Sequence, residues 1–199
     1  MKDLRYKIVF YSEWQCGSGL SAGADVDLLP IMDKDELPFV PGKTMKGLVR
    51  EAAEILYDMR KDGDKSSLAE LFGNSKDKNI IKSMEEKKED DTSFMKKGET
   101  FFTNATLDKV TAKTIKNNHA AKFLYKSIAS TSIEDNGIAK NHSLRKVQTV
   151  IPLTLYGEIK NIPDYLENDL INALHLIKRM GSGRNRGLGR CDIKLETEV

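Results

Sequence analysis

Apolar and polar positions divide the chain into six regular segments. Residues 7–14, 100–107 and 188–195 are rich in β-branched and aromatic side chains, which is typical of strands. Residues 147–159 also predict a strand, bent at Pro152 and ending near Gly157. Apolar residues recur at three- and four-residue steps over 45–59 and 164–180, which predicts two amphipathic helices. Asp164 and Glu167 fit the spacing of a cap on the second helix, and Gly181 suits its end.

The order of these segments is β-α-β-β-α-β. This order is the signature of an α+β, ferredoxin-like fold built from a split βαβ unit. We expect a single domain over residues 1–199 with two long insertions. The insertion at about 61–98 is strongly charged and is expected to be mobile, whereas that at 108–144 is polar and has no clear period.

Composition limits the kinds of partner and the cellular compartment that we expect. The chain has 32 Lys and Arg against 30 Asp and Glu, so affinity for nucleic acid must come from local clustering of charge. Two cysteines make neither a disulfide framework nor a zinc site, which favours a reducing, cytoplasmic setting. No stretch approaches the roughly 20 apolar residues of a membrane helix.

The strongest local signal is a basic, glycine-rich stretch after the second helix. Glycines allow close approach of the backbone to a ligand, and arginines present a planar fork that matches phosphate. Together they predict a cradle for a phosphate backbone, and the alternative is a helix cap followed by a flexible basic turn. The stretch has no acidic residue and contains Lys178, Arg179, Gly181, Gly183, Arg184, Arg186, Gly187, Gly189 and Arg190.

A second cationic group lies at the start of the first helix. Lys43 and Lys46 oppose the helix dipole there, which favours an anion docking at this end. Thr44 and, one turn later, Arg50 would line the same wall, which we expect to lie next to the glycine-rich stretch, although ordinary solvated lysines would look alike. The stretch is not a nucleotide P-loop, because Leu37 stands where that motif needs its first glycine.

Acidic and imidazole side chains give weaker signals. Asp25, Asp27, Asp33 and Asp35 crowd the loop between the first strand and the first helix, where they could hold Mg²⁺ or form a solvated acidic loop. The three histidines lack metal-ligand spacing. His142 stands among basic residues, which indicates an RNA contact or a surface residue, and His175 is expected to be structural.

Three segments carry a family resemblance. Residues 38–50 (PFVPGKTMKGLVR) resemble the P-x-I-P-G-S-S-L-K-G-x-x-R segment of the RAMP superfamily, the repeat-associated proteins of CRISPR systems. Residues 181–190 resemble the glycine-rich loop of that superfamily. Residues 132–150 resemble a looser motif of the type III effector backbone subunits. The sequence departs from the pattern at Lys43-Thr44, which replace a Ser-Ser pair, and it lacks a histidine after the first strand.

The resemblance implies an RNA-recognition-like, ferredoxin-type core and a subunit that binds guide RNA. Such a subunit would stack with copies of itself or close relatives inside a type III CRISPR complex, pair guide with target RNA, and act in antiviral defence. The segment at 119–145 would be a thumb hairpin that kinks the guide–target duplex. We expect RNA contacts from the glycine-rich loop and from Lys43, Thr44, Lys46, Arg50, His142 and Arg145.

The resemblance also implies a possible catalytic role. Allowing one gap, the aspartate that supports Mg²⁺-dependent cleavage of bound target RNA in the backbone subunits falls on Asp27, with Asp25 as the fallback. Two alternatives stay open. One is a metal-independent endoribonuclease that processes CRISPR transcripts with His119 or His142, and the other is a structural subunit without chemistry.

Overall fold

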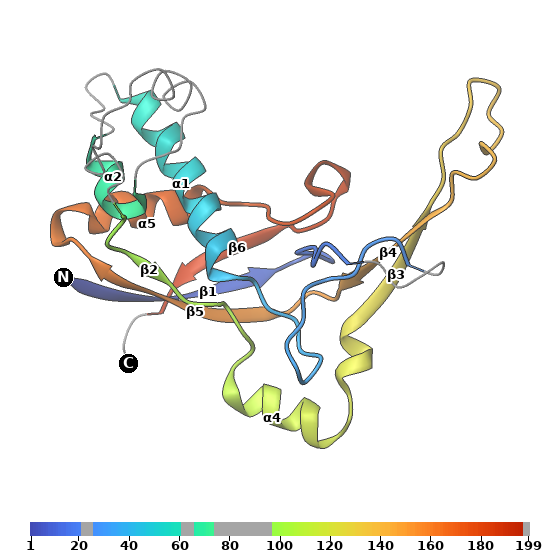
Figure 1. The fold of residues 1–199 in the computed structure, drawn as a ribbon, viewed down its shortest axis with the longest axis horizontal. Coiled ribbons are helices and arrows are strands. Elements are labelled where there is room, and N and C mark those ends of the chain that lie inside the picture. The colour runs from blue at the N-terminus through green and yellow to red at the C-terminus, as the bar shows by residue number, and fades with distance from the viewer. Residues whose placement is uncertain (21–25, 61–65, 74–96, 197–199) are drawn as a thin grey trace, which may run out of the picture.

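The computed structural model describes residues 1–20, 26–60, 66–73 and 97–196. One twisted sheet carries helices on one side, and a long hairpin projects from its end (Figure 1). The described elements are β1 (Lys2–Phe10), α1 (Gly42–Met59), α2 (Ser66–Phe72), β2 (Phe101–Phe102), α4 (Lys109–Asn117), η2 (Ala121–Leu124), β3 (Tyr125–Ser130), β4 (Arg145–Val150), β5 (Thr154–Ile162), η3 (Asp164–Leu166), α5 (Glu167–Leu176), η4 (Arg184–Arg186) and β6 (Cys191–Leu195).

The main sheet has the strand order β2-β5-β1-β6, and every neighbouring pair is antiparallel. The first strand therefore lies between the third and fourth strands of the core, and the second strand forms an edge. With α1 after β1 and α5 after β5, this is the split βαβ arrangement. The predicted ferredoxin-like fold is confirmed.

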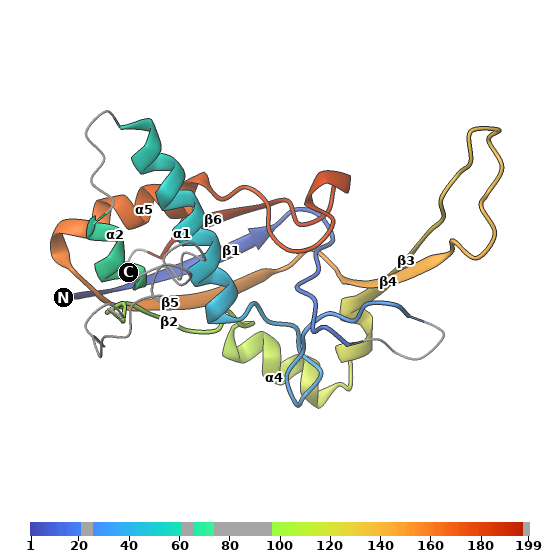
Figure 2. The same ribbon diagram turned by 45° about the horizontal axis from the view of Figure 1, so that its top comes forward.

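Alternation along β1 builds the core. Leu4, Tyr6, Ile8 and Phe10 are buried, while the residues between them are exposed or partly exposed. Figures 1 and 2 show α1 and α5 on the same side of the sheet. Gly157 of β5 lies opposite Tyr6, and a Cβ at this position would come within 2.5 Å of the Tyr6 hydroxyl, so glycine leaves room for the ring.

One carboxylate ties the end of α1 to the start of α5. The Tyr57 hydroxyl donates to Oδ2 of Asp169 at 2.7 Å, and the Arg60 guanidinium donates to Oδ1 at 2.6 Å. These bonds, with Arg60 as the largest cause, lower the pKa of Asp169 below its ordinary value. The two helices are therefore pinned together by a charge-assisted contact as well as by their apolar faces.

Several boundaries differ from the predictions. The first strand ends at Phe10, because residues 11–15 leave the sheet for other partners. The segment 147–159 is two strands, and Pro152, which has no N–H to donate, lies in the break between β4 and β5. β5 then runs through Gly157 to Ile162, and α5 ends at Leu176 rather than Met180. Asp164 starts η3, and within the described residues no side chain caps α5.

The segment 108–144 contains regular structure that its polar sequence conceals. Asp108 caps α4 by accepting the N–H groups of Val110 and Thr111 at 3.1 and 2.9 Å. η2 follows α4, and β3 pairs with β4 to form the projecting hairpin, whose tip spans 131–144. This hairpin lies where the family resemblance places a thumb.

The charged insertion at 61–98 falls mostly outside the described residues, at 61–65 and 74–96. Between these two parts, α2 packs Leu68, Leu71 and Phe72 into the core. None of the described helices is long and apolar enough to cross a membrane.

Candidate nucleic-acid interface

The glycine-rich stretch forms a tight loop between α5 and β6. Gly181, Gly183, Gly187 and Gly189 all have positive φ, between 70° and 87°, a region that side chains disfavour. Between the middle two glycines, residues 184–186 form the short helix η4. The glycines are therefore required by the path of the chain, which explains why so many occur together.

The base of the loop is bonded to the chain that follows β1. The N–H of Gly189 donates to Glu13 O at 2.7 Å, and the N–H of Ser182 donates to Gln15 O at 2.8 Å. A Cβ on Gly181 would lie 2.3 Å from Gln15 O, so only glycine allows this approach. These contacts fix the two ends of the loop and leave residues 182–187 exposed to solvent.

Three exposed arginines, Arg184, Arg186 and Arg190, project from this loop. Within the described part of the chain none of them forms an ion pair with a carboxylate. The N–H groups of Arg184 and Asn185 belong to the first turn of η4, where a helix offers them no acceptor. Free N–H groups beside unpaired guanidinium groups form a site suited to phosphate oxygens.

The neighbouring cations of this loop already have partners. Lys178 pairs with Asp192 at 2.8 Å, and this contact is the largest cause of the lowered pKa of Asp192. The Arg179 guanidinium donates to the carbonyl of Arg184 at 2.7 Å, which supports η4 from one side. Arg190 also lies 5.9 Å from the centre of the Tyr11 ring. Lys178, Arg179 and Arg190 therefore have side-chain contacts within the protein. Arg184 and Arg186 have none among the described residues.

The start of α1 forms a second, separate cationic site. The N–H of Gly42 donates to Oδ1 of Asn104 at 2.9 Å, and a Cβ on Gly42 would meet the carbonyl of Phe102. Lys43 is exposed on the first turn, and Thr44 is partly buried. Burial, with Arg50 and Lys97 nearby, lowers the pKa of Lys46. Like charges held together in this way favour an anion as a ligand.

Arg50 differs from the other predicted contacts. Its guanidinium donates to the carbonyl of Gly73, lies 5.9 Å from the centre of the Phe72 ring, and pairs with Glu54 at 3.5 Å. The side chain therefore holds α1 against α2. Its structural bonds explain its presence without a ligand.

The loop and the start of α1 do not touch, although the sequence suggested that they adjoin. The start of α1 lies against β2, at one edge of the sheet, whereas the loop leads into β6, at the other edge. Three strand spacings separate the two edges, which is about 14 Å. A single phosphate cannot reach both sites, so a ligand that binds both must be an extended chain.

The hairpin positions the remaining predicted residues. His142 and Arg145 are exposed, at its tip and at the start of β4. Asp27 lies beside the end of β4 that is nearer the hairpin tip, where its carboxylate Oδ2 accepts the N–H of Lys146 at 2.8 Å and its own N–H donates to Lys146 O at 2.9 Å. Asp25 lies outside the described residues.

Asp27 does not belong to a group of three or more metal-ligating side chains among the described residues. The described residues contain no group of three or more His, Cys, Asp or Glu side chains that could hold a metal ion. The protein atoms described here therefore do not form a Mg²⁺ site by themselves.

The histidines are all exposed. His119 and His142 have positive φ, at 50° and 57°, and so mark turns. His175 was expected to be structural, but α5 turns it to solvent, so that expectation is wrong.

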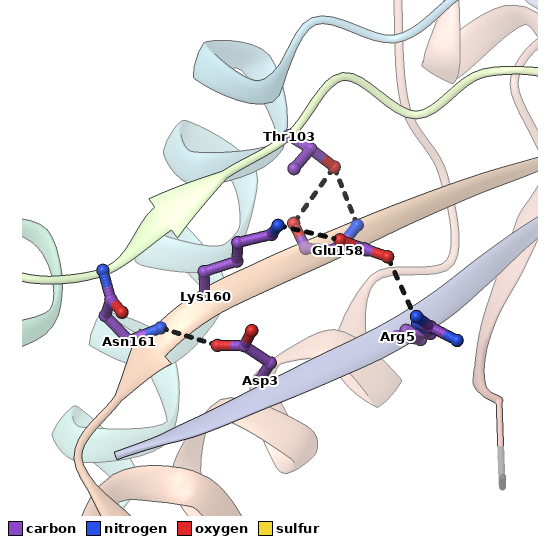
Figure 3. Close-up of polar contacts among 6 residues, drawn as sticks. All are labelled: Asp3, Arg5, Thr103, Glu158, Lys160 and Asn161. Carbon is purple, nitrogen blue, oxygen red and sulfur yellow. Dashed lines mark hydrogen bonds and ion pairs between the residues drawn. The ribbon is translucent and has the colours of Figure 1, made fainter.

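The face of the sheet turned away from α1 and α5 carries paired charges (Figure 3). One carboxylate, that of Glu158, accepts from Arg5 at 3.2 Å and pairs with Lys160 at 3.3 Å. The Thr103 hydroxyl accepts the backbone N–H of Glu158 at 2.8 Å. Arg5 and Lys160 therefore share one acidic partner, whereas Arg184 and Arg186 of the loop have no acidic partner among the described residues.

Two supports of the site could not be found from the sequence. Residues 12–15 carry the loop through backbone groups and the Ser12 hydroxyl, which accepts the N–H of Arg190 at 2.9 Å. Asn104, in the segment that follows β2, accepts the first N–H of α1. Backbone acceptors leave no mark in sequence, and an asparagine after a strand usually indicates only a turn.

The comparisons with known proteins agree with this geometry. No curated protein sequence matches the chain. A chain of the "Cryo-EM structure of the Type III-B Cmr-beta bound to cognate target RNA" is similar with a TM-score of 0.64 and 19% identity, over 98% of this chain and 60% of that one. A chain of the "Type III-B Cmr-beta Cryo-EM structure of the Apo state" is similar with a TM-score of 0.68 and 9% identity, over 97% of this chain and 96% of that one.

At these identities the structural matches show a shared fold, and this chain spans three fifths of the length of the first one. The sequence itself matches the family model described as the RAMP superfamily over residues 8–192. That match includes the end of β1, both core helices, the hairpin and the glycine-rich loop. The chain therefore belongs to the RAMP superfamily.

Proposed function

We propose that this protein is a guide-RNA-binding subunit of a type III CRISPR effector complex. The observation that carries the proposal is the loop at 181–190, in which four left-handed glycines present unpaired arginines and free N–H groups. Family membership and the fold shared with chains of Type III-B Cmr-beta complexes support it. The complex would work in antiviral defence in the cytoplasm, where the two free cysteines stay reduced.

The geometry favours a guide that is held by its backbone. Arg184, Arg186 and the loop N–H groups meet phosphates, and the cations at the start of α1 meet others farther along the chain. None of these groups reads a base, so target recognition would rest on pairing between guide and target, as in other RNA-guided systems. Other subunits, including copies of this chain, would continue the path of the RNA.

The double variant Arg184→Ala/Arg186→Ala tests the proposal. For single-stranded RNA, each phosphate contact contributes about 0.7 to the slope of log affinity against log salt. The double variant should therefore bind more weakly, with a slope shallower by about 1.4. Arg5→Ala/Lys160→Ala is the matched control, because it removes two cations that already share Glu158. If the loop variant binds RNA with the affinity and slope of the wild type, the proposal is wrong.

Cleavage of bound target RNA is a second candidate, for which Asp27 is the observation. Its carboxylate is fixed beside the tip end of β4 by the Lys146 N–H, and Asp27 is exposed to solvent. Any Mg²⁺ there would need most of its ligands from RNA and water, which is common for this ion. Asp27 could equally serve only to hold the loop against β4, and a variant can separate the two roles.

Asp27→Asn keeps an oxygen that accepts the Lys146 N–H but removes the charge, whereas Asp27→Ala removes both. Under the catalytic proposal, both variants lose Mg²⁺-dependent cleavage and Asp27→Asn keeps the affinity for RNA. Cleavage by Asp27→Asn at the wild-type rate would limit Asp27 to a structural role. Cleavage that persists in EDTA and is lost on replacing His119 or His142 would indicate a processing nuclease instead. If no metal supports cleavage, the subunit is structural.

A further inference from the structure

A third cationic surface lies away from both the glycine-rich loop and the start of α1. Figures 1 and 2 show α4, and the turn that follows it, on the other side of the sheet from α1 and α5. The sequence from Lys109 to Ile133 contains five lysines and one histidine but no aspartate or glutamate. In a chain with 32 cations and 30 acids, such a stretch concentrates positive charge on one part of the surface.

Three of these lysines have no acidic partner among the residues that the structure describes. Lys109 and Lys113 are exposed one turn apart on α4, and Lys122 is exposed in η2. Ala112 and Ile115 of the same helix pack against the core, so the lysine-bearing side faces solvent. In the described part of the chain, no carboxylate forms an ion pair with any of the three.

The other two lysines of the stretch already have partners. Lys116 pairs with Asp35 at 2.8 Å, and Lys126 pairs with Glu13 at 3.1 Å. The same short stretch therefore contains free and neutralised lysines of similar exposure. That contrast provides an internal control for any ligand that binds through charge.

An exposed aromatic ring stands beside the free lysines. Phe123 is 70% exposed, and Nζ of Lys122 lies 5.1 Å from the centre of its ring. The next residue, Leu124, is buried and anchors η2, so Phe123 is presented outward from a fixed base. An aromatic ring flanked by cations is how single-stranded nucleic acids are bound, with a base on the ring and phosphates on the lysines. A protein partner would instead favour an apolar centre poor in charge.

We propose that the α4–η2 surface, formed by Lys109, Lys113, Lys122 and Phe123, binds single-stranded RNA. The lysines contact phosphates, and Phe123 stacks on one unpaired base, since a paired base within a duplex has no free face to offer. The inference rests on the proposed function, because the strand would be RNA that continues beyond the part held by the glycine-rich loop. The surface has no base-specific donors, so it would tolerate any sequence.

Charge is tested by a salt titration of the full-length chain with a fluorescently labelled oligouridylate. Lys109→Gln/Lys113→Gln/Lys122→Gln should make the slope of log affinity against log salt shallower by about 2, at about 0.7 for each lost contact. Lys116→Gln/Lys126→Gln should leave the slope close to that of the wild type. An unchanged slope in the triple variant overturns the inference.

Stacking is tested by Phe123→Ala with two probes, the oligouridylate and an oligonucleotide of equal length made of abasic residues. Loss of one stacked base should weaken binding to the oligouridylate about tenfold and leave the abasic probe unaffected. Phe123→Trp should retain the wild-type affinity for the oligouridylate. An equal loss on both probes would show that the ring does not meet a base.

The loop variant Arg184→Ala/Arg186→Ala separates this inference from the proposed function. If the loop variant weakens RNA binding and the triple lysine variant does not, the inference fails alone. If neither variant weakens binding, both fail. A triple variant that keeps its affinity for RNA but loses association with other copies of the chain would mark the surface as a protein contact, which also overturns the inference.

Discussion

Replacing Gly189 by alanine is the sharpest test of the claim that a preset backbone forms the RNA-binding loop. Gly189 has φ of 70°, and a Cβ there would lie 1.9 Å from the carbonyl oxygen of Met180. The residue also makes two backbone hydrogen bonds, to Glu13 O at 2.7 Å and from the Met180 N–H at 2.9 Å. An alanine cannot occupy this place unless the backbone moves.

The size of the effect follows from these contacts. A side chain in the left-handed region costs about 1–2 kcal/mol. Moving the backbone away from Met180 breaks both hydrogen bonds, at about 0.5–1.5 kcal/mol each. Gly187 provides the matched control, because it has φ of 87° but nothing within 4 Å of a Cβ, so Gly187→Ala has only the conformational cost. The two variants should differ by about 2 kcal/mol, which is about 30-fold in affinity.

Fluorescence anisotropy with a labelled single-stranded RNA measures this difference. We expect Gly187→Ala to bind moderately more weakly than the wild type and Gly189→Ala to bind about 30-fold more weakly than Gly187→Ala. Thermal unfolding of both variants shows whether the loss is confined to the loop. Equal affinities for the two alanine variants would refute the reasoning, because the loop would then bind RNA without its preset shape.

Three further predictions concern stability. Tyr6→Phe should keep or raise the midpoint of thermal unfolding, because the buried Tyr6 hydroxyl has no hydrogen-bond partner among the described residues, and a midpoint lowered by several degrees would contradict this. Asp169→Asn should lower the free energy of unfolding in urea by about 2 kcal/mol at neutral pH. Arg60 lowers the pKa of Asp169, so the extra stability of the wild type over Asp169→Asn should be complete above the ordinary pKa of 3.8 and disappear as the pH falls through the lower folded pKa. A stability difference that does not change with pH would contradict this prediction. Asp108→Ala should cost about 1 kcal/mol by uncapping α4, seen as faster amide exchange at Val110 and Thr111.

The core elements were predictable because their signals are local. The stripe of α1 repeats over five turns, and every second residue of β1 from Leu4 to Phe10 is apolar and buried. Strand β3 gave no such signal, whereas most of β4 lies in the segment 147–159 that was predicted as a strand. Most of β3 is exposed on both faces, so its sequence does not alternate between apolar and polar residues. A hairpin that projects from the fold lacks the burial that makes strands recognisable.

The candidate site was predictable only in part. Clustered glycines indicate an unusual backbone path, and Gly181, Gly183, Gly187 and Gly189 all have positive φ, whereas their role in binding RNA stays a prediction. Arg50 shows the limit, because its carbonyl and aromatic partners at Gly73 and Phe72 are brought to it by α2. The early end of β1 has the same origin. Tyr11 and Trp14 bond to Arg190 and Val150, and no local pattern predicts partners so distant in sequence.

Residues 11–15 connect two parts of the molecule that would handle RNA. Successive peptide groups in this extended segment point in opposite directions, so Glu13 and Gln15 accept from the loop while Trp14 exchanges both of its backbone bonds with Val150 of β4. Neither the loop nor the hairpin can slide relative to the other without breaking main-chain bonds. The backbone of residues 11–15 therefore sets the spacing between the loop arginines and the root of the hairpin, whatever side chains these residues carry.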